Sequence, residues 1–217
     1  IGSQIVNLEP FTDSAKKVLS LINELKKEKI NLSHVDLGGG LGIKYKDEPL
    51  IKKRDYVRSV VEVFKNSNLK IIFEPGRSVV GDAGILVTKV IEKKNNKNGK
   101  KFIIVDAGMN DLIRPPLYGA YHKISPVKKN NTSTDLFDIV GPVCETADFF
   151  GKDRHLVANI GDLVVVEDAG AYGFVLSSNY NSRPRVAEYL ISNNNVSCIR
   201  GREKFSDIIG DEEDYLG

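Results

Sequence analysis

Two short glycine-containing motifs in the first third of the chain could bind an anion or a cofactor. Gly38–Gly42 follows a short apolar run and precedes helical sequence, where small residues let backbone N–H groups approach an anion such as a phosphate. Glu74-Pro75-Gly76-Arg77 ends the next apolar run. A glutamate there can pair with a protonated ring nitrogen, and an arginine can bind a phosphate or carboxylate through its fork of donors. Taken singly, each motif is equally consistent with a surface turn.

Three further motifs lie in the rest of the chain. Arg114-Pro115-Pro116-Leu117-Tyr118 holds an arginine beside two prolines, which is typical of a fixed carboxylate clamp, although a rigid surface loop is the alternative. Cys144-Glu145 follows Gly141-Pro142 and puts a thiol beside a carboxylate, a pair that can transfer protons. Asp168–Gly173 ends the strongest β-type run and presents Tyr172. Cys198 is predicted to be a small core residue, as most cysteines of soluble proteins are.

The first third of the chain alternates between strand and helix patterns. Elements are predicted at Ile1–Val6, from Thr12 or Asp13 onward, and at Val35–Leu37, Asp55–Phe64 and Lys70–Phe73. This order is typical of a parallel sheet covered by helices. Neighbouring parallel strands then deliver the glycine-rich motif and Glu74 to the same edge, where barrel enzymes place their sites.

From about Val79 the helical period gives way to short β-branched runs, at Ile85–Ile91, Phe102–Val105, Leu136–Val140 and Leu163–Glu167. A further strand at Arg185–Ile191 and a helical turn at Phe205–Ile209 are weaker candidates. We predict an α/β unit over residues 1–80 and an antiparallel β unit over residues 81–217, with the change near Arg77–Gly84. The charged run Lys93–Lys101 predicts a solvated hairpin with an Asn-Gly turn rather than an anion-binding patch.

The bulk composition excludes several classes of partner. A net charge of +2 gives no reason to expect nucleic acid or a membrane surface, and no apolar run approaches the about 20 residues of a spanning helix. Two cysteines fit a reducing compartment, so we predict a cytoplasmic protein. His34, His122 and His155 show no metal-ligand spacing, and no metal site is predicted. The start at Ile1 predicts a piece of a longer protein.

Taken in order, these motifs resemble those of diaminopimelate decarboxylases, and Ala169–Arg185 is especially close. The matching segments are Ile1–Gln4, Asp36–Gly42, Glu74–Arg77, Asp106–Met109, Arg114–Tyr118, Gly141–Asp148 and Asp168–Asn181. Seven motifs in the right order are highly specific, and the resemblance covers most of the chain. It implies the last part of a pyridoxal-phosphate-binding (β/α)8 barrel over residues 1–80, followed by an antiparallel β-barrel-like domain over residues 81–217 that contributes substrate and dimer-interface residues.

The resemblance implies a role for each polar group near the cofactor, pyridoxal 5'-phosphate. Glu74 would pair with the pyridine nitrogen and keep it protonated. Tyr172 would lie against the cofactor and the substrate. The cofactor phosphate would be held by Gly38, Gly39 and Gly40, with help from Ser3 and Arg77.

The resemblance also implies how an amino-acid substrate is bound. Arg77, Arg114 and Tyr118 would fix its carboxylates. Cys144, as the catalytic proton donor, and Glu145, which would recognise the distal end, would reach across a homodimer interface into the neighbour's site. The family's usual Cys-Glu-Ser-Gly-Asp corresponds here to Cys144–Asp148, with Thr146 in place of serine and Ala147 in place of glycine. The methyl group of Ala147 predicts a loop whose backbone has less conformational freedom.

The implied activity is decarboxylation of meso-2,6-diaminopimelate to L-lysine with release of carbon dioxide. Arg114 and Glu145 disfavour a related decarboxylase of basic amino acids or carboxynorspermidine. A non-catalytic decarboxylase-like binding protein is the third reading, because the family's Schiff-base lysine belongs upstream of Ile1. Only three of eight barrel strands are represented. We therefore expect that the N-terminal half of the enzyme either exists as a second polypeptide or has been lost. We expect this chain alone to be inactive.

Overall fold

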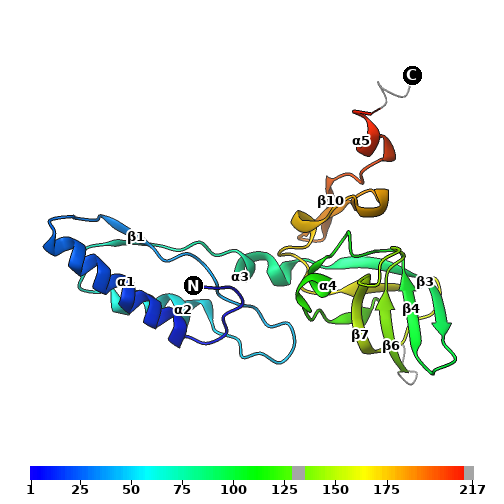
Figure 1. Cartoon of the computed structure of the whole chain (residues 1–217), viewed down its shortest axis with the longest axis horizontal. Coiled ribbons are helices and arrows are strands. Elements are labelled where there is room, and N and C mark those ends of the chain that lie inside the picture. The colour runs from blue at the N-terminus through cyan, green and yellow to red at the C-terminus, as the bar shows by residue number, and fades with distance from the viewer. Residues whose placement is uncertain (129–134, 213–217) are drawn as a thin grey trace. The chain divides into compact units, whose positions relative to one another are not determined.

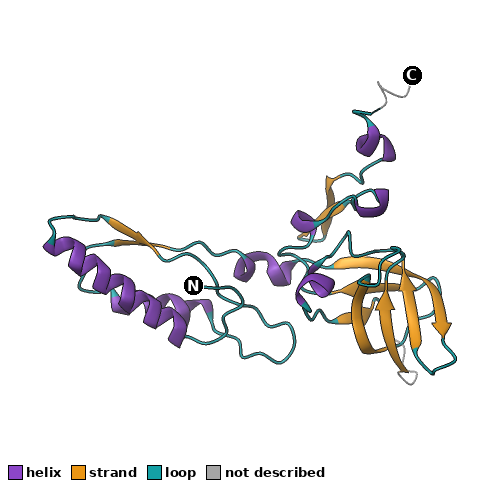
Figure 2. Cartoon of the chain, viewed as in Figure 1, coloured by secondary structure: helices purple, strands orange, loops and turns teal. Residues whose placement is uncertain are grey.

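The computed structural model describes residues 1–128 and 135–212. The chain divides into two compact units, Ile1–Gly84 and Ile85–Gly217, each of which is described by itself. Figure 1 colours the chain from its N-terminus, and Figure 2 marks its helices and strands. Within the described part of the chain, no helix is both long enough and apolar enough to cross a bilayer.

Unit 1 alternates helix and strand as expected. It contains α1 (Glu9–Lys27), β1 (His34–Asp36), α2 (Lys53–Val63), β2 (Lys70–Ile72), α3 (Arg77–Val80) and the short 3-10 helix η1 (Gly81–Ala83). The strands β1 and β2 pair in parallel, with Val35 opposite Ile71. The predicted parallel arrangement of these two strands is confirmed.

Two predicted boundaries in unit 1 are wrong. Helix α1 begins at Glu9 rather than at Thr12 or Asp13, because Pro10 supplies a fixed φ in its first turn. The segment Ile1–Val6 forms no strand apart from a parallel bridge between Ile5 and Leu41. Gln4 has a φ of 58°, which interrupts the extended backbone that a strand requires.

The core of unit 1 lies between its helices and the strand pair. Phe11 and Ala15 from α1 are buried against Tyr56 and Val60 from α2, so each helix buries a face of residues four positions apart. The rings of Phe11 and Tyr56 pack edge to face with centroids 4.6 Å apart. Burial raises the pKa of Tyr56.

Unit 2 contains a six-stranded sheet in the order β5-β8-β3-β4-β6-β7. Its strands are β3 (Leu86–Asn95), β4 (Lys101–Val105), β5 (Ile124–Pro126), β6 (Asp135–Val140), β7 (Phe149–Leu156) and β8 (Leu163–Val166). The edge strands β5 and β7 have Cα atoms within 8 Å of one another, so the sheet is nearly closed. The barrel-like part of the prediction is partly consistent with this sheet.

The prediction of a purely antiparallel domain is wrong for one pair of strands. The sheet is mixed, because β4 and β6 pair in parallel, with Ile103 opposite Ile139. The chain between these strands forms α4 (Arg114–Tyr118) and β5, and a crossover of this kind is what a parallel pair requires. Ile103 and Ile139 are fully buried, so their pairing lies in the core of the sheet.

The charged run Lys93–Lys101 forms the predicted hairpin between β3 and β4. Gly99 has a φ of 82° and donates its N–H to the carbonyl oxygen of Asn96 at 2.9 Å. An asparagine–glycine pair suits such a turn because glycine adopts positive φ without steric cost. Residues 93–100 of this run are exposed, as a solvated turn requires, and Lys101 is half-buried.

The last part of unit 2 contains η2 (Phe174–Leu176), η3 (Tyr180–Ser182), β9 (Glu188–Ser192), β10 (Asn195–Arg200) and α5 (Phe205–Ile209). The strands β9 and β10 form an antiparallel hairpin. Cys198 on β10 is exposed, so its prediction as a core residue is wrong. All six residues of β10 are exposed, because this hairpin stands as a separate two-stranded sheet.

Glu203 connects the end of this hairpin to the segment that precedes it. Its Oε1 accepts hydrogen bonds from Arg185 Nε at 3.0 Å and Nη2 at 2.7 Å. Its Oε2 accepts from the Arg185 backbone N–H at 2.8 Å and from Asn179 Nδ2 at 2.6 Å. The Arg185 guanidinium, followed by these other donors, lowers the pKa of Glu203 to about 2.

We expect Glu203→Gln to change the acid sensitivity of the chain. A carboxyl with a lowered folded-state pKa stabilises the fold above its ordinary value of 4.5, and this contribution is lost as the pH falls toward about 2. The wild-type advantage over Glu203→Gln in urea unfolding should therefore be present at pH 6 and disappear by pH 2. Glu212→Gln, at an exposed position, serves as the control. An advantage that is the same at both pH values would contradict the prediction.

Candidate active site

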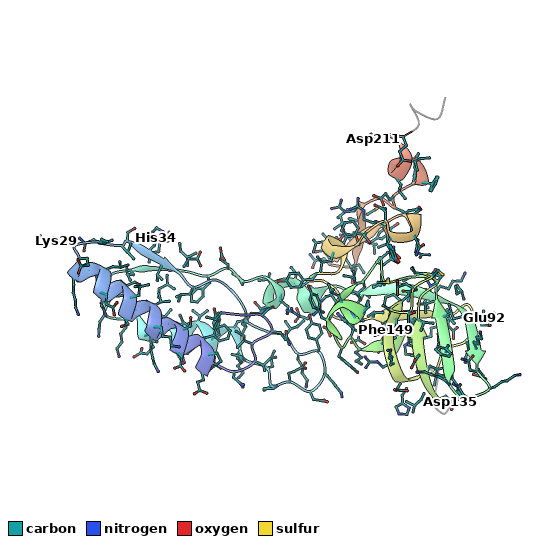
Figure 3. All side chains as sticks on the ribbon, viewed as in Figure 1. Lys29, His34, Glu92, Asp135, Phe149 and Asp211 are labelled. Carbon is teal, nitrogen blue, oxygen red and sulfur yellow. The ribbon has the colours of Figure 1, made fainter. Side chains whose placement is uncertain are left out.

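Three loops leave the same end of the sheet in unit 2. Strand β6 is parallel to β4, and β8 points the same way because β3 is antiparallel to both β4 and β8. The loops that follow β4, β6 and β8 therefore start at the same end of the sheet, with β3 between β8 and β4. These loops carry Cys144, Glu145 and Tyr172. Asp135, labelled in Figure 3, begins β6 and marks the opposite end of the sheet.

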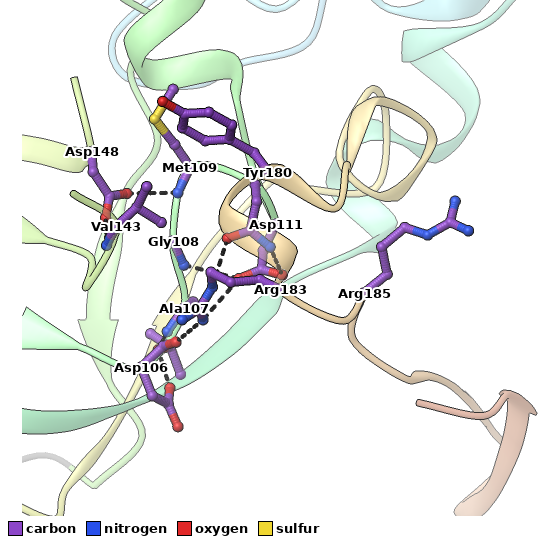
Figure 4. A network of polar contacts seen from close by, with 12 residues as sticks. Asp106, Ala107, Gly108, Met109, Asp111, Val143, Asp148, Tyr180, Arg183 and Arg185 are labelled. Carbon is purple, nitrogen blue, oxygen red and sulfur yellow. Dashed lines mark hydrogen bonds and ion pairs between the residues drawn. The ribbon is translucent and has the colours of Figure 1, made fainter. Parts of the chain in front are cut away.

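The loop after β6 is held by the buried carboxylate of Asp148. Its Oδ1 accepts the N–H of Met109 at 2.6 Å, and its Oδ2 accepts the N–H of Val143 at 2.6 Å (Figure 4). Its own N–H donates to the carbonyl oxygen of Glu145 at 3.0 Å. Burial raises the pKa of Asp148, while the two N–H donors oppose this rise. One side chain thus joins the loop after β6 to the loop after β4.

Cys144 and Glu145 project from this loop into solvent. Both residues are exposed. Glu145 Oε2 accepts a hydrogen bond from the hydroxyl of Tyr180 at 3.4 Å, and its Oε1 accepts the N–H of Ala147 at 3.3 Å. Ala147 lies outside the left-handed region of the backbone, so its methyl group fits without strain. The thiol and the carboxylate are available to a ligand on this face of unit 2.

Arg183 joins the loop after β8 to the loop after β4. Its Nε donates to Asn110 Oδ1 at 2.9 Å, and its Nη2 donates to the carbonyl oxygen of Asp106 at 2.6 Å. Its Nη2 also lies 4.0 Å from Asp111 Oδ2. Burial raises the pKa of Asp111. Figure 4 shows Arg183 pointing into this turn, whereas Arg185 points away from it.

The arginine and tyrosine of α4 are in different surroundings. Arg114 is only 5% exposed, and its Nη1 lies 2.7 Å from His122 Nε2. His122 Nδ1 lies 2.8 Å from the carbonyl oxygen of Glu167, at the end of β8. Tyr118 is 66% exposed. The contacts of Arg114 thus connect α4 to the loop that carries Tyr172, which is 40% exposed and has a φ of 59°.

In unit 1, the glycine-rich loop lies against the segment that contains Glu74. The N–H of Glu74 donates to the carbonyl oxygen of Gly38 at 2.9 Å. A Cβ at Gly39 would collide with the carbonyl oxygen of Glu74, so only glycine permits this approach. Gly38 and Gly40 have φ values of 69° and 105°, which also favour glycine. The side chain of Glu74 is exposed beside the loop.

Arg77 contacts Ser3, near the N-terminus, beside this glycine-rich loop. Its Nη2 donates to Ser3 Oγ at 3.1 Å, and its Nη1 donates to the hydroxyl of Tyr45 at 2.8 Å. Ile5 donates its N–H to the carbonyl oxygen of Gly40 at 3.0 Å, which holds Ser3 near the glycines. A guanidinium, a hydroxyl and a glycine-rich backbone are the groups that bind a phosphate. These residues therefore fit the phosphate of a cofactor.

The structure gathers the predicted site residues into two groups, one in each unit. Ser3, Gly38, Gly39, Gly40, Glu74 and Arg77 lie together in unit 1, and the loops of unit 2 carry Arg114, Tyr118, Cys144, Glu145 and Tyr172. Sequence reasoning gave no role to the residues that hold these groups, namely Tyr45, Asn110, Asp111, His122, Asp148 and Arg183. Only Asp148 could have been identified from the sequence. It is the last residue of the loop that begins at Gly141, and the strand β7 begins at the next residue.

We expect Asp148→Asn to destabilise unit 2 by about 2–3 kcal/mol, because an amide NH2 cannot accept the N–H that one carboxylate oxygen accepts. Urea unfolding followed by circular dichroism measures this loss. Asp153→Asn is the matched control, since Asp153 is exposed on β7 and its φ of 51° suits asparagine. Equal losses of stability in the two variants would show that the Asp148 contacts stabilise unit 2 no more than an exposed carboxylate does.

Comparison with known proteins identifies the family. A family described as pyridoxal-dependent decarboxylase, C-terminal sheet domain, matches residues 16–170. The diaminopimelate decarboxylase of Vibrio cholerae is 47% identical over 209 residues, which cover 96% of this chain and 50% of that protein. The crystal structure of diaminopimelate decarboxylase from Helicobacter pylori complexed with L-lysine has a TM-score of 0.93 at 42% identity, covering 100% of this chain and 54% of that one.

The enzyme from M. jannaschii in co-complex with L-lysine is also similar, with a TM-score of 0.93 at 39% identity over 98% of this chain and 50% of that one. The chain spans about half the length of the curated relatives it matches. The sequence motifs, the fold of the sheet and the region that the family model matches all point to the same family. The chain belongs to the pyridoxal-dependent decarboxylase family, and its similarity within that family is to diaminopimelate decarboxylases.

Proposed function

We propose that this chain is part of an enzyme that decarboxylates meso-2,6-diaminopimelate to L-lysine and carbon dioxide. The observation that carries the proposal is the Cys144-Glu145 pair, exposed on a loop that Asp148 fixes, in a chain 47% identical to a diaminopimelate decarboxylase. L-Lysine, which is bound in two of the similar structures, is diaminopimelate without one carboxyl group. A binding protein without catalysis has no need of this pair.

The two units are proposed to have separate tasks. Residues 1–80 form the last part of a (β/α)8 barrel, and the parallel pair of β1 and β2 with α1 and α2 supports this assignment. The remaining barrel strands come from the N-terminal half of the enzyme. Residues 81–217 form the sheet domain, which contributes substrate and dimer-interface residues.

The residues of unit 1 are proposed to hold pyridoxal 5'-phosphate. Arg77 and Ser3 bind the phosphate together with the backbone of Gly38, Gly39 and Gly40. Glu74 accepts a hydrogen bond from the pyridine nitrogen and so keeps a proton on that atom. Tyr172, a residue of unit 2, is proposed to lie against the ring as well. When bound, the cofactor accepts the electron pair that remains after the bond to carbon dioxide breaks.

The residues of unit 2 are proposed to recognise a substrate that is an amino acid at both ends. Arg114 and Tyr118, together with Arg77, fix its carboxylates, and Glu145 binds the distal ammonium group. The thiol of Cys144 donates a proton to the carbon atom that has lost carbon dioxide. A decarboxylase of simple basic amino acids needs no clamp for a second carboxylate, so the arginine of α4 favours diaminopimelate.

The complete enzyme is proposed to be a cytoplasmic homodimer in which Cys144 and Glu145 enter the partner's site. The exposure of both side chains and the two free, exposed cysteines support this proposal. A loop that offers a thiol and a carboxylate away from its own unit is suited to complete a neighbouring site. This chain by itself is proposed to be inactive.

Complementation between two inactive variants tests the proposal. Arg77→Ala and Cys144→Ala are made in the complete enzyme, and L-lysine and carbon dioxide released from meso-2,6-diaminopimelate are measured. Each variant should be nearly inactive, and a mixture of the two, unfolded and refolded together, should recover about a quarter of the wild-type activity, since half of the dimers then contain one intact site. Cys198→Ala, which changes the other exposed cysteine, should be fully active.

Two results would contradict these proposals separately. If mixed dimers form but recover no activity, the sites are not shared between subunits. If the wild-type enzyme releases carbon dioxide from ornithine, arginine or carboxynorspermidine faster than from diaminopimelate, the substrate assignment is wrong. Absence of decarboxylation with all of these amino acids would favour the non-catalytic binding protein.

A further inference from the structure

We propose that His122 is a positioning residue that fixes α4, with Arg114 and Tyr118, relative to the loop that carries Tyr172. This inference rests on the proposed function, because these three residues are the ones proposed to bind the substrate. His122 is fully buried in unit 2, between α4 and the end of β8.

Two contacts of His122 indicate which ring nitrogen carries the proton. The carbonyl oxygen of Glu167, 2.8 Å from Nδ1, can only accept a hydrogen bond, so Nδ1 must carry hydrogen. Arg114 Nη1, 2.7 Å from Nε2, can only donate, so Nε2 must offer its lone pair. The neutral imidazole with hydrogen on Nδ1 satisfies both partners. A protonated ring would direct an N–H at the arginine and would leave that contact repulsive.

The anchor at Glu167 is itself rigid. Its N–H donates to the carbonyl oxygen of Lys123 at 2.9 Å, and its carboxylate accepts a hydrogen bond from Ser125 Oγ at 2.8 Å. Lys123 Nζ lies 3.1 Å from the same carboxylate. The carbonyl group that accepts from His122 is therefore fixed by the chain at the start of β5. A contact to this carbonyl defines the position of the imidazole ring.

By contrast, α4 gains little rigidity from its own backbone hydrogen bonds. It has five residues, of which Pro115 and Pro116 lack an N–H group. It ends at Gly119, whose φ of 61° turns the chain back toward His122. The burial of Pro115 and the packing of α4 against β7 hold the helix in place. The contact between Arg114 and His122 adds a directional polar anchor, which orients the guanidinium of Arg114 and the helix that carries Tyr118.

Two amide substitutions separate the two contacts of His122. Asn places its amide nitrogen near the position of Nδ1, so His122→Asn retains the donor toward Glu167 and loses the acceptor for Arg114. Gln places its amide oxygen near Nε2, so His122→Gln retains the acceptor for Arg114 and loses the donor. Both remove part of the ring, so general loss of packing affects them alike. His155→Gln, at an exposed position on β7, controls for loss of an imidazole.

In the complete enzyme, we expect His122→Asn to raise KM for diaminopimelate about tenfold, the change that follows from losing one hydrogen bond to a charged group. The kcat should change less, because Cys144 is unaffected. His122→Gln should retain a KM closer to that of the wild type, although the melting temperatures of the two variants fall to a similar extent. Equal KM values for both variants, with equal losses of stability, would overturn the positioning role and leave His122 a packing residue.

A second measurement does not depend on catalysis. Nitrogen-15 spectra of this chain should show His122 with hydrogen on Nδ1 and a bare Nε2, and the signals of Tyr118 should shift more in His122→Asn than in His122→Gln. The opposite tautomer, or Tyr118 signals unchanged in both variants, would overturn the inference. If the wild-type enzyme fails to decarboxylate diaminopimelate, the proposed function falls, while these spectra still decide the role of His122.

Discussion

The parallel pairing of β4 with β6 is the constraint on which the rest of unit 2 depends. In an antiparallel meander, successive loops alternate between the two ends of a sheet, so chemistry on consecutive loops would be separated. Here the crossover through α4 and β5 brings β6 back in the direction of β4. Because Ile103 and Ile139 are fully buried at this pairing, a shift of one residue would move apolar side chains out of the core. Three loops that are distant in sequence thereby meet at one end.

The loops at this end are held by polar contacts as well as by the burial of apolar side chains such as Leu112 and Val143. Asp148 and Asp111 each accept backbone N–H groups, and Arg183 donates to a backbone carbonyl and to Asn110. A buried polar group that loses its partner is costly, so alternative loop conformations are strongly disfavoured. Arg77 has the same function in unit 1, where it joins segments far apart in the chain. The exposed reactive groups are thus presented by a rigid frame.

The sequence was sufficient wherever a local pattern decides the structure. The helix α5 was placed correctly at Phe205–Ile209, and β2 agrees within one residue, because the period of apolar residues is visible in a short window. The strands β5, β7 and β10 were missed. Strand β5 has three residues and includes a proline, and β7 buries only Phe150 and Leu156 among its apolar side chains, so neither has a clear period.

The residues that support the site were missed for a different reason. His122 shows no ligand spacing, and its partner Glu167 lies 45 positions away in sequence, so only the fold reveals the contact. Cys198 was placed in a core on the general behaviour of cysteine, whereas the hairpin that carries it buries none of the side chains of β10. Residue type predicts chemistry well, but it predicts burial only when the neighbours in space are known.

The close approach of Gly141 to Asp148 has a consequence for how this sequence can vary. A Cβ at position 141 would lie 2.6 Å from Asp148 Oδ1, so any other residue there would displace the carboxylate that orders the loop. A Cβ at this position would also lie 2.7 Å from the carbonyl oxygen of Ala107, so glycine is required at 141 wherever this loop geometry is kept. A homologue with a larger residue at 141 must hold its cysteine-bearing loop by other contacts. Glycine at 141 provides a simple criterion, readable from an alignment, for deciding which homologues share the loop geometry.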